Sequence, residues 1–332
     1  MKRIIIVFGA MLTCVYGTFA APDVTDVVAR QRYPWNGLVD ITCKVTGIDA
    51  ANDNIFVVAA VMPDSGEVRK VSHFWVVQNG TNSTDQNVST NGNYRLLWDA
   101  SADLGQVVYD NMVMRVTIRT RNKVQLWANG PYWAECNVGA SRPEDFGYYF
   151  WWGDTIGYRR VNDAWVASDG SSSNFSFSVK NTPTWNKREA TLHSERWVVL
   201  QNGTYGSTYV LTPAHDAAHV QWGGDWRMPT QRELEKLDSY CDWTWTTRNG
   251  VNGYEVRGHG DYASNSIFLP CAGYGSETSL YSAGSSGQFW SSVPGGDCYS
   301  WGLESATGGH RMQSGDGRYL GLSVRPVQGF TE

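Results

Sequence analysis

The chain has 332 residues, of which 42% are hydrophobic and 18% charged, so it can bury sizeable cores and is not globally disordered. The 27 lysines and arginines against 32 aspartates and glutamates give a net charge of −5, which provides no basic excess for a nucleic-acid partner. Of the 16 tryptophans, 13 follow residue 120. This shift in composition predicts two domains, with a boundary between Arg119 and Tyr132.

The first twenty residues have the pattern of a cleaved secretory signal peptide. Lys2 and Arg3 precede an apolar stretch, residues 4–16, and small residues at Thr18 and Ala20 suit a cleavage site. The apolar stretch is shorter than a bilayer span and no second candidate follows, so we expect a secreted or cell-surface protein without a transmembrane helix. Export permits disulfides, and an odd number of cysteines remains: Cys43, Cys136, Cys241, Cys271 and Cys298.

Residues 22–122 have the pattern of short β-strands. In residues 38–45 every second residue is apolar, which predicts a half-buried strand with Cys43 pointing inward. The continuous apolar run at residues 55–62 predicts a strand buried on both faces, and residues 112–119 alternate again. Because no helical period accompanies these strands, we expect an all-β sandwich of the immunoglobulin or fibronectin kind.

Residues 124–330 have a different pattern, with two expected helices. The first covers residues 213–221, and the second begins after Thr230, which forms a capping box with Glu233. The rest is rich in glycine, serine and aromatic residues, which predicts many turns and loops. Two short strands are expected, at residues 266–269 and 320–324.

Several motifs of this second part occur in the same order in one bacterial family. They are Trp133–Ala140, Trp222–Thr230, Trp243–Thr247, Phe289–Ser292 and Ser323–Val327. With them the chain resembles the Fibrobacter succinogenes major paralogous domain, which belongs to the C-type-lectin-like and formylglycine-generating-enzyme-like superfamily. The resemblance implies an α+β C-type-lectin-like domain with two helices, a small sheet and long loops, placed after the N-terminal sandwich.

The resemblance leaves the chemistry open, because enzymes, lectins and protein-binding modules share this superfamily. Formylglycine-generating enzymes hold copper with two nearby late cysteines, whereas only Cys298 lies late in this chain. The calcium-lectin motifs are also missing. We therefore expect a binding protein without a cofactor, with a structural calcium ion left open. An oxidase or another enzyme on the same fold, and a structural envelope component, are the alternatives.

Two further groups of residues have competing interpretations. His215 and His219 are spaced to ligate zinc from one helix, but the glutamate of HExxH and a third ligand are missing, so a helix with one packed and one solvated histidine is favoured. Most tryptophans are expected in the core, namely Trp133, Trp222, Trp226 and Trp290. Trp301, and secondarily Trp151 or Trp152, are candidates for stacking on a ligand.

The glycine-rich segment from Gly295 to Gly321 carries the candidate binding residues. Tyrosine, serine, glycine and arginine are typical of adaptable binding loops, and in C-type-lectin-like folds the late loops form the ligand face, which some relatives diversify. The competing interpretation is a surface loop without a ligand. We expect an adhesin-like protein that binds an extracellular protein or glycan through Tyr299, Trp301, Glu304, His310, Arg311, Asp316, Arg318 and Tyr319.

Overall fold

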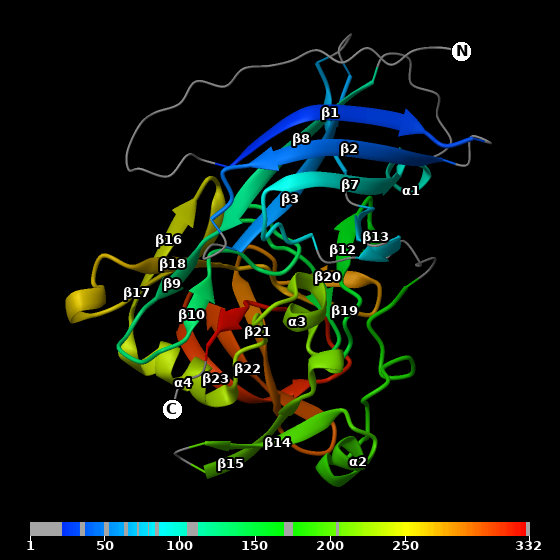
Figure 1. Cartoon of the computed structure of the whole chain (residues 1–332). Coiled ribbons are helices and arrows are strands. Elements are labelled where there is room, and N and C mark those ends of the chain that lie inside the picture. Colours follow the sequence, from blue (N-terminus) through cyan, green and yellow to red (C-terminus); the bar gives the residue numbers. More distant parts are fainter. Residues whose placement is uncertain are drawn as a thin grey trace. The chain divides into compact units, whose positions relative to one another are not determined.

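The computed structural model is rich in β-strands and has few, short helices (Figure 1). It describes residues 22–33, 37–49, 53–62, 66–71, 73–78, 80–83, 86–104, 112–168, 175–203 and 206–329. The expected signal peptide, residues 1–20, lies outside these ranges. Among the described helices, none is long and apolar enough to span a membrane.

The chain divides into two compact units, Met1–Arg121 and Asn122–Glu332. This division falls inside the interval proposed from composition. That each side folds separately remains a prediction, which limited proteolysis within residues 119–132 would test.

The first unit contains two antiparallel sheets, ordered β1-β2-β7-β5-β6 and β4-β3-β8. Their strands are β1 Asp23–Gln31, β2 Leu38–Thr46, β3 Asp53–Val61, β4 Val68–Lys70, β5 Phe74–Gln78, β6 Thr81–Ser83, β7 Gly92–Asp99 and β8 Val113–Arg121. A short helix that the sequence did not predict, α1 (Ala100–Leu104), follows β7.

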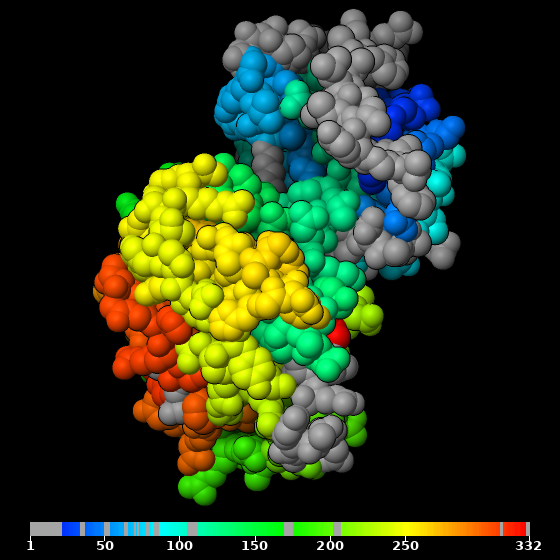
Figure 2. All heavy atoms as spheres, turned by 90° about the vertical axis from the view of Figure 1, so that its left-hand side faces the viewer, coloured from blue at the N-terminus to red at the C-terminus, as the bar shows by residue number. Residues whose placement is uncertain are grey.

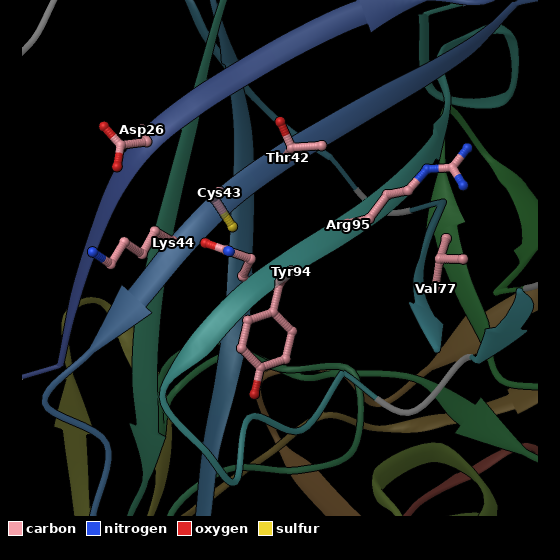
Figure 3. Close-up of a pocket in the computed structure, with 8 residues that line it drawn as sticks. Asp26, Thr42, Cys43, Lys44, Val77, Tyr94 and Arg95 are labelled. Atoms are coloured by element: carbon pink, nitrogen blue, oxygen red, sulfur yellow. The ribbon is translucent and has the colours of Figure 1, made fainter. Parts of the chain in front are cut away.

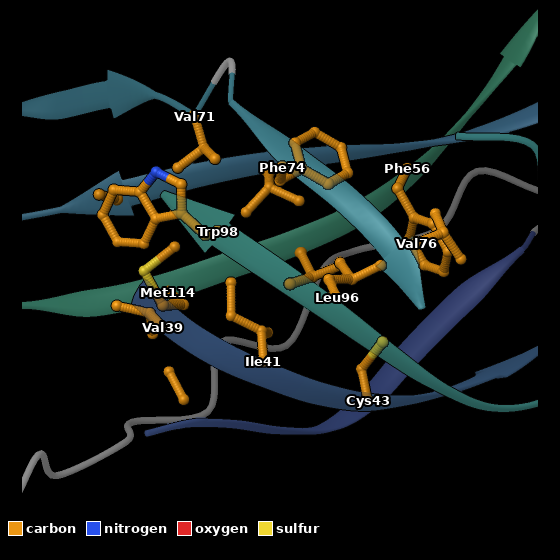
Figure 4. Packing of buried hydrophobic residues seen from close by; sticks show 14 of the residues in the cluster. Val39, Ile41, Cys43, Phe56, Val71, Phe74, Val76, Leu96, Trp98 and Met114 are labelled. Atoms are coloured by element: carbon orange, nitrogen blue, oxygen red, sulfur yellow. The ribbon is translucent and has the colours of Figure 1, made fainter. Parts of the chain in front are cut away.

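Side chains of both sheets share one hydrophobic core (Figure 4). The predicted alternation of β2 is confirmed, with Cys43 among the buried residues. The expectation that residues 55–62 are buried on both faces is wrong. Phe56 and Val58 are buried, whereas Val57 and Ala59 are half-buried, because the core cluster packs on one face of β3.

The second unit is built around a seven-stranded sheet, ordered β13-β12-β11-β24-β21-β22-β23. Its strands are β11 Tyr149–Phe150, β12 Tyr158–Val161, β13 Ala164–Ala167, β21 Ser286–Pro294, β22 Tyr299–Ala306, β23 Gly309–Gly317 and β24 Leu322–Ser323. Two smaller sheets have three strands each: one contains β9 Lys123–Gln125, β10 Tyr132–Ala134 and β25 Val327–Gln328, and the other contains β16 Asp242–Arg248, β17 Val251–Arg257 and β18 Ser266–Pro270. Two further sheets have two strands each: one contains β14 Val198–Gly203 and β15 Gly206–Leu211, and the other contains β19 Tyr274–Ser276 and β20 Ser279–Tyr281.

The second unit also contains short helices, which are α2 Glu189–Ser194, α3 Ala217–Trp222, α4 Gln231–Tyr240 and the 3₁₀ helices η1 Pro213–His215 and η2 Gly260–Tyr262. The predicted capping box of α4 is confirmed. The Thr230 hydroxyl accepts from the Glu233 backbone N–H at 3.2 Å, and the Glu233 carboxylate accepts from the Thr230 N–H at 2.8 Å. The helix expected over residues 213–221 is instead two pieces. Asp216 separates η1 from α3 and caps α3 by accepting from the His219 N–H.

The tryptophan core of the second unit agrees with the sequence analysis in its main members. Trp133, Trp222, Trp226 and Trp290 are buried. The suggestion that Trp151 or Trp152 stacks on a ligand is wrong, because both are buried as well. Their indole N–H groups donate to the carbonyl oxygens of Tyr319 and Ser291, respectively.

The late segment differs most from the sequence-based expectation. In place of long binding loops, most of it forms the antiparallel hairpin of β22 and β23, at the edge of the seven-stranded sheet. One glycine shows why the composition was misleading. A Cβ on Gly302 would lie 2.9 Å from both the Asp316 Oδ2 and the Phe289 carbonyl oxygen. Gly302 thus permits close packing within a sheet, where we expected it to loosen a loop.

Candidate ligand-binding face

The β22–β23 hairpin divides the predicted binding residues between two faces. Side chains alternate along a strand, so Tyr299 and Trp301 share a face with Leu303, while Gly302 and Glu304 lie on the other. Directly paired residues share a face too, which places His310 with the first set, opposite Ser305, and Arg311 with the second, opposite Glu304. We call these the aromatic face (Tyr299, Trp301, His310) and the polar face (Gly302, Glu304, Arg311).

The aromatic face is covered at one end and open at the other. Leu303 is buried in the cluster that includes Leu234 and Leu237 of α4. Towards the start of β22 the cover ends, and Trp301 is half-buried while Tyr299 is 46% exposed. Figure 2 shows the orange-red surface of β22 and β23 beside the yellow and yellow-green surface of β16, β17 and α4.

Tyr299 and Trp301 are distinguished by what they do not contact. Within the described part of the chain, neither side chain makes a hydrogen bond or a ring contact. They lie two residues apart on one strand, roughly 7 Å along it. A half-exposed pair of aromatic side chains without partners is a suitable platform for stacking.

His310, by contrast, is used to fasten the hairpin. Its Nδ1 lies 2.5 Å from an Asp238 carboxylate oxygen on α4. Its ring stacks on Trp243 of β16, with centroids 4.1 Å apart and an interplanar angle of 16°. Tyr254 contacts the same ring edge-on at 5.8 Å. The structure thus places this predicted ligand contact in a bracing position between three elements.

The polar face contains an ion pair and a buried carboxyl group. Arg311 and Glu304 approach to 2.8 Å, and the Arg311 side chain is 70% exposed. The Asp316 carboxyl lies against Gly302 and is only 6% exposed. Burial, followed by the charge of Glu304, raises the pKa of Asp316 to about 7, and Arg311 opposes this shift. An acid with this pKa binds and releases its proton near neutral pH.

Arg318 and Tyr319 lie beyond the end of β23, and their contacts are structural. Arg318 is fully buried, and its guanidinium donates to the carbonyl oxygens of Tyr299 at 2.9 Å, Lys187 at 2.7 Å and Gly296 at 2.5 Å. Tyr319 packs edge-on against Trp185 with centroids 5.0 Å apart. The expectation that Arg318 faces a ligand is corrected here. Its five N–H donors match several converging carbonyl groups, so the side chain points inward.

All five described cysteines are free. One of them, Cys298, is partly exposed, and the other four are buried. The Cys298 thiol donates to the Asn186 Oδ1 at 2.8 Å. Burial raises the pKa of the Cys43 and Cys271 thiols to about 11, so these thiols stay protonated and unreactive at neutral pH.

The histidine pair considered as a zinc site has separate partners. His215 belongs to η1 and stacks on Trp197 at 3.9 Å, whereas His219 belongs to α3 and its Nδ1 lies 3.3 Å from the Trp226 carbonyl oxygen. The two imidazoles therefore do not share one helix. Among the residues placed by the structure, no group of three or more His, Cys, Asp or Glu side chains is arranged to hold a metal ion.

The first unit has a shallow hollow of about 420 Å³ (Figure 3). Its charged members, Asp26, Lys44 and Arg95, come from β1, β2 and β7, respectively. None of the eight predicted binding residues contributes to it. The complete lining is Asp26, Thr42, Cys43, Lys44, Val77, Asn93, Tyr94 and Arg95.

Strand β21 contributes to the polar face two residues that were not predicted from the sequence. Gln288 pairs directly with Glu304, and Ser286 lies two residues away on the same face. The sequence does contain a pattern that indicates them. In residues 286–290, Ser286 and Gln288 alternate with Gly287 and Phe289, and this alternation is typical of a strand with one polar face. No protein-family model, curated protein or solved structure matches this chain.

Proposed function

We propose that this protein is a secreted or cell-surface binding protein, and that the open end of its aromatic face contacts an extracellular protein or glycan. The single observation that carries the proposal is the pair Tyr299 and Trp301, which are accessible and have no partner for their rings or polar atoms among the described residues. Within this proposal, the second unit is a C-type-lectin-like head and the first unit an immunoglobulin-like spacer.

The surroundings of the pair support a binding role. Large aromatic side chains contribute most of the energy of many interfaces, and their flat faces stack on sugar rings and on partner side chains. The residues preceding Tyr299 add exposed charge, because Asp297 forms an ion pair with Arg188 at 3.4 Å and both are mostly exposed. An apolar centre with a polar rim is the usual composition of a binding surface.

The thiol arrangement supports binding over the oxidase alternative. The resemblance implies that the oxidase would hold copper with two cysteines close together, because soft thiolates bind copper(I). Here Cys298 is partly exposed and hydrogen-bonded to Asn186, while the other four described cysteines are buried. We therefore place the proposed function on the aromatic side chains.

The proposal is tested by screening the protein against a glycan array and a panel of bacterial and host surface proteins, followed by calorimetry on any ligand found. Changing Tyr299→Ala or Trp301→Ala should weaken binding by about 2 kcal/mol or more, roughly thirtyfold, as expected for an aromatic anchor. The melting temperature should change little in Tyr299→Ala, because that side chain is 46% exposed, and should fall somewhat more in Trp301→Ala, because Trp301 is half-buried.

The matched control is Tyr281→Ala, since Tyr281 is 47% exposed and lies on β20, outside the hairpin. This variant should bind like the wild type. Normal binding by both hairpin variants would refute the proposed face, and so would an equal loss of binding in the control.

A further inference from the structure

Strand β23 is the last strand of the seven-stranded sheet, and its outer edge is open. Among the described strands it pairs only with β22. Beyond that ladder, the backbone of residues 310–313 forms no backbone–backbone hydrogen bond to another described segment. The strand also contains neither proline nor lysine, which commonly block exposed edges. Its outward N–H and C=O groups can therefore pair with a further strand.

An irregularity in the hairpin sets the length of this edge. Opposite Trp301 of β22, β23 has two residues instead of one, Ser314 and Gly315. The regular ladder ends there and leaves residues 309–313, which is about the mean length of a strand. Gly309 and Gly315 are both exposed, and a Cβ added at either would meet no atom within 4 Å. The backbone is thus accessible at both ends of this edge.

The brace at His310 holds β23 in place without using the edge. His310 contacts Asp238 of α4 and Trp243 of β16 through its side chain. Side chains stand roughly perpendicular to a sheet, whereas the hydrogen-bonding groups of its edge lie in the plane of the sheet. Because β23 is already fixed to two other elements, pairing with a further strand orders few additional groups of this protein.

The two faces of β23 determine which side chains suit a paired strand. Met312 is half-buried and pairs with Leu303, so it belongs to the aromatic face. Arg311 belongs to the polar face and is 70% exposed. Its Nε donates to Glu304 at 2.9 Å, and a guanidinium has further donors for a second carboxylate. Since directly opposed residues share a face, an apolar residue suits the place across from Met312 and an acidic residue the place across from Arg311.

We propose that the edge of β23, at residues 309–313, binds an extended segment of a partner protein in which apolar and acidic residues alternate. Main-chain hydrogen bonds provide the affinity in this mode of recognition, and alternate side chains provide the specificity. This inference rests on the proposed function, because the bound segment places its apolar side chains on the same face as Tyr299 and Trp301. It selects a protein partner over a glycan, since a sugar chain has no regular row of backbone donors and acceptors.

The test uses the full chain and synthetic seven-residue peptides with blocked ends, in which valine alternates with glutamate or with lysine. Binding is followed by the fluorescence polarisation of a labelled peptide. The glutamate peptide should bind, and the lysine peptide should bind roughly tenfold more weakly, because Arg311 attracts one and repels the other.

Backbone methylation of the glutamate peptide shows whether it binds as a strand. Only every second N–H group of a paired strand faces its neighbour. Methylating one alternating set of nitrogens should therefore abolish binding, whereas methylating the other set should leave it. A peptide held only by its side chains would respond alike to both patterns.

Reversing the charge at the edge provides the second arm. Arg311→Glu should shift the preference from the glutamate peptide to the lysine peptide. Arg311→Gln should remove the preference, and it keeps the test valid if Arg311→Glu does not fold beside Glu304. The matched control is Arg248→Glu, which changes a half-exposed arginine on another edge strand, β16, and should keep the wild-type preference.

Three results would overturn the proposal: no binding of either peptide at about 1 mM, equal sensitivity to both methylation patterns, or an unchanged preference in both Arg311 variants. A glycan or protein ligand that loses affinity in Trp301→Ala, together with no peptide binding, would support the aromatic face and refute the edge. Peptide binding that follows the methylation and charge rules but is unchanged in Tyr299→Ala and Trp301→Ala would support the edge and count against the aromatic face.

Discussion

Replacing Arg318 with methionine separates the two roles that this residue could have. The sequence suggests a ligand contact, while the structure shows a buried guanidinium that ties the start of β22 to two neighbouring segments. Its Nε donates to the Tyr299 carbonyl at 2.9 Å, and its two terminal nitrogens donate to Lys187 and Gly296. The guanidinium also lies over the Trp152 ring, 4.8 Å from the centroid. Methionine keeps the length of the side chain and removes all the donors.

The expected cost is large because several carbonyl groups lose their partner together. A hydrogen bond to a charged group contributes about 1.5–3 kcal/mol, but removing the guanidinium also removes the cost of burying its charge. Burial is visible in the pKa of Arg318, which it lowers to about 10. We therefore expect Arg318→Met to reduce the free energy of unfolding by about 3–5 kcal/mol. Arg318→Lys should be intermediate, since one ammonium cannot reach all three directions.

Denaturant unfolding followed by tryptophan fluorescence provides the measurement. Of the 16 tryptophans, 13 lie after residue 120, so the fluorescence signal reports mainly on the second unit. If the first unit unfolds in its own transition, that transition is fitted with its own free energy of unfolding. A loss below about 1 kcal/mol in Arg318→Met would refute the bracing role. A variant with normal stability and no ligand binding would restore the original interpretation of Arg318 as a contact residue.

Three further changes test the framework around the hairpin. Gly302→Ala should destabilise the second unit by about 1–3 kcal/mol in denaturant titrations, because its Cβ would lie 2.9 Å from the Phe289 carbonyl oxygen, which cannot move away as a side chain could. Thr230→Ala should cost about 1 kcal/mol, measured in the same way, because it removes half of the capping box; Thr230→Ser should restore most of it. Burial lowers the pKa of His215 below its ordinary value of 6.5, so the unfolded chain binds the proton more readily and stability is lost as the pH falls through 6.5 and below. Melting curves from pH 8 to pH 5 should show a smaller loss in His215→Gln, and parallel curves would contradict this reasoning.

Local patterns in the sequence determined the parts of the structure that depend on a few neighbouring residues. The alternation of β2 predicted which side chains point inward, because successive side chains of a strand point to opposite faces. The capping box of Thr230 and Glu233 predicted the start of α4, because both of its hydrogen bonds form within four residues. The change in composition predicted a boundary between Arg119 and Tyr132, and the structure divides inside this interval, after Arg121.

The placement of the candidate binding residues was decided by pairing between segments, which local patterns do not encode. Glycine and serine in residues 295–321 are typical of loops, but here they allow close approach within a sheet. Once β22 pairs with both β21 and β23, alternation separates Tyr299 and Trp301 from Glu304 and Arg311. Converging carbonyl groups from distant segments then draw Arg318 into the interior. Only tertiary structure brings those groups together, because their positions depend on chain segments more than 100 residues apart.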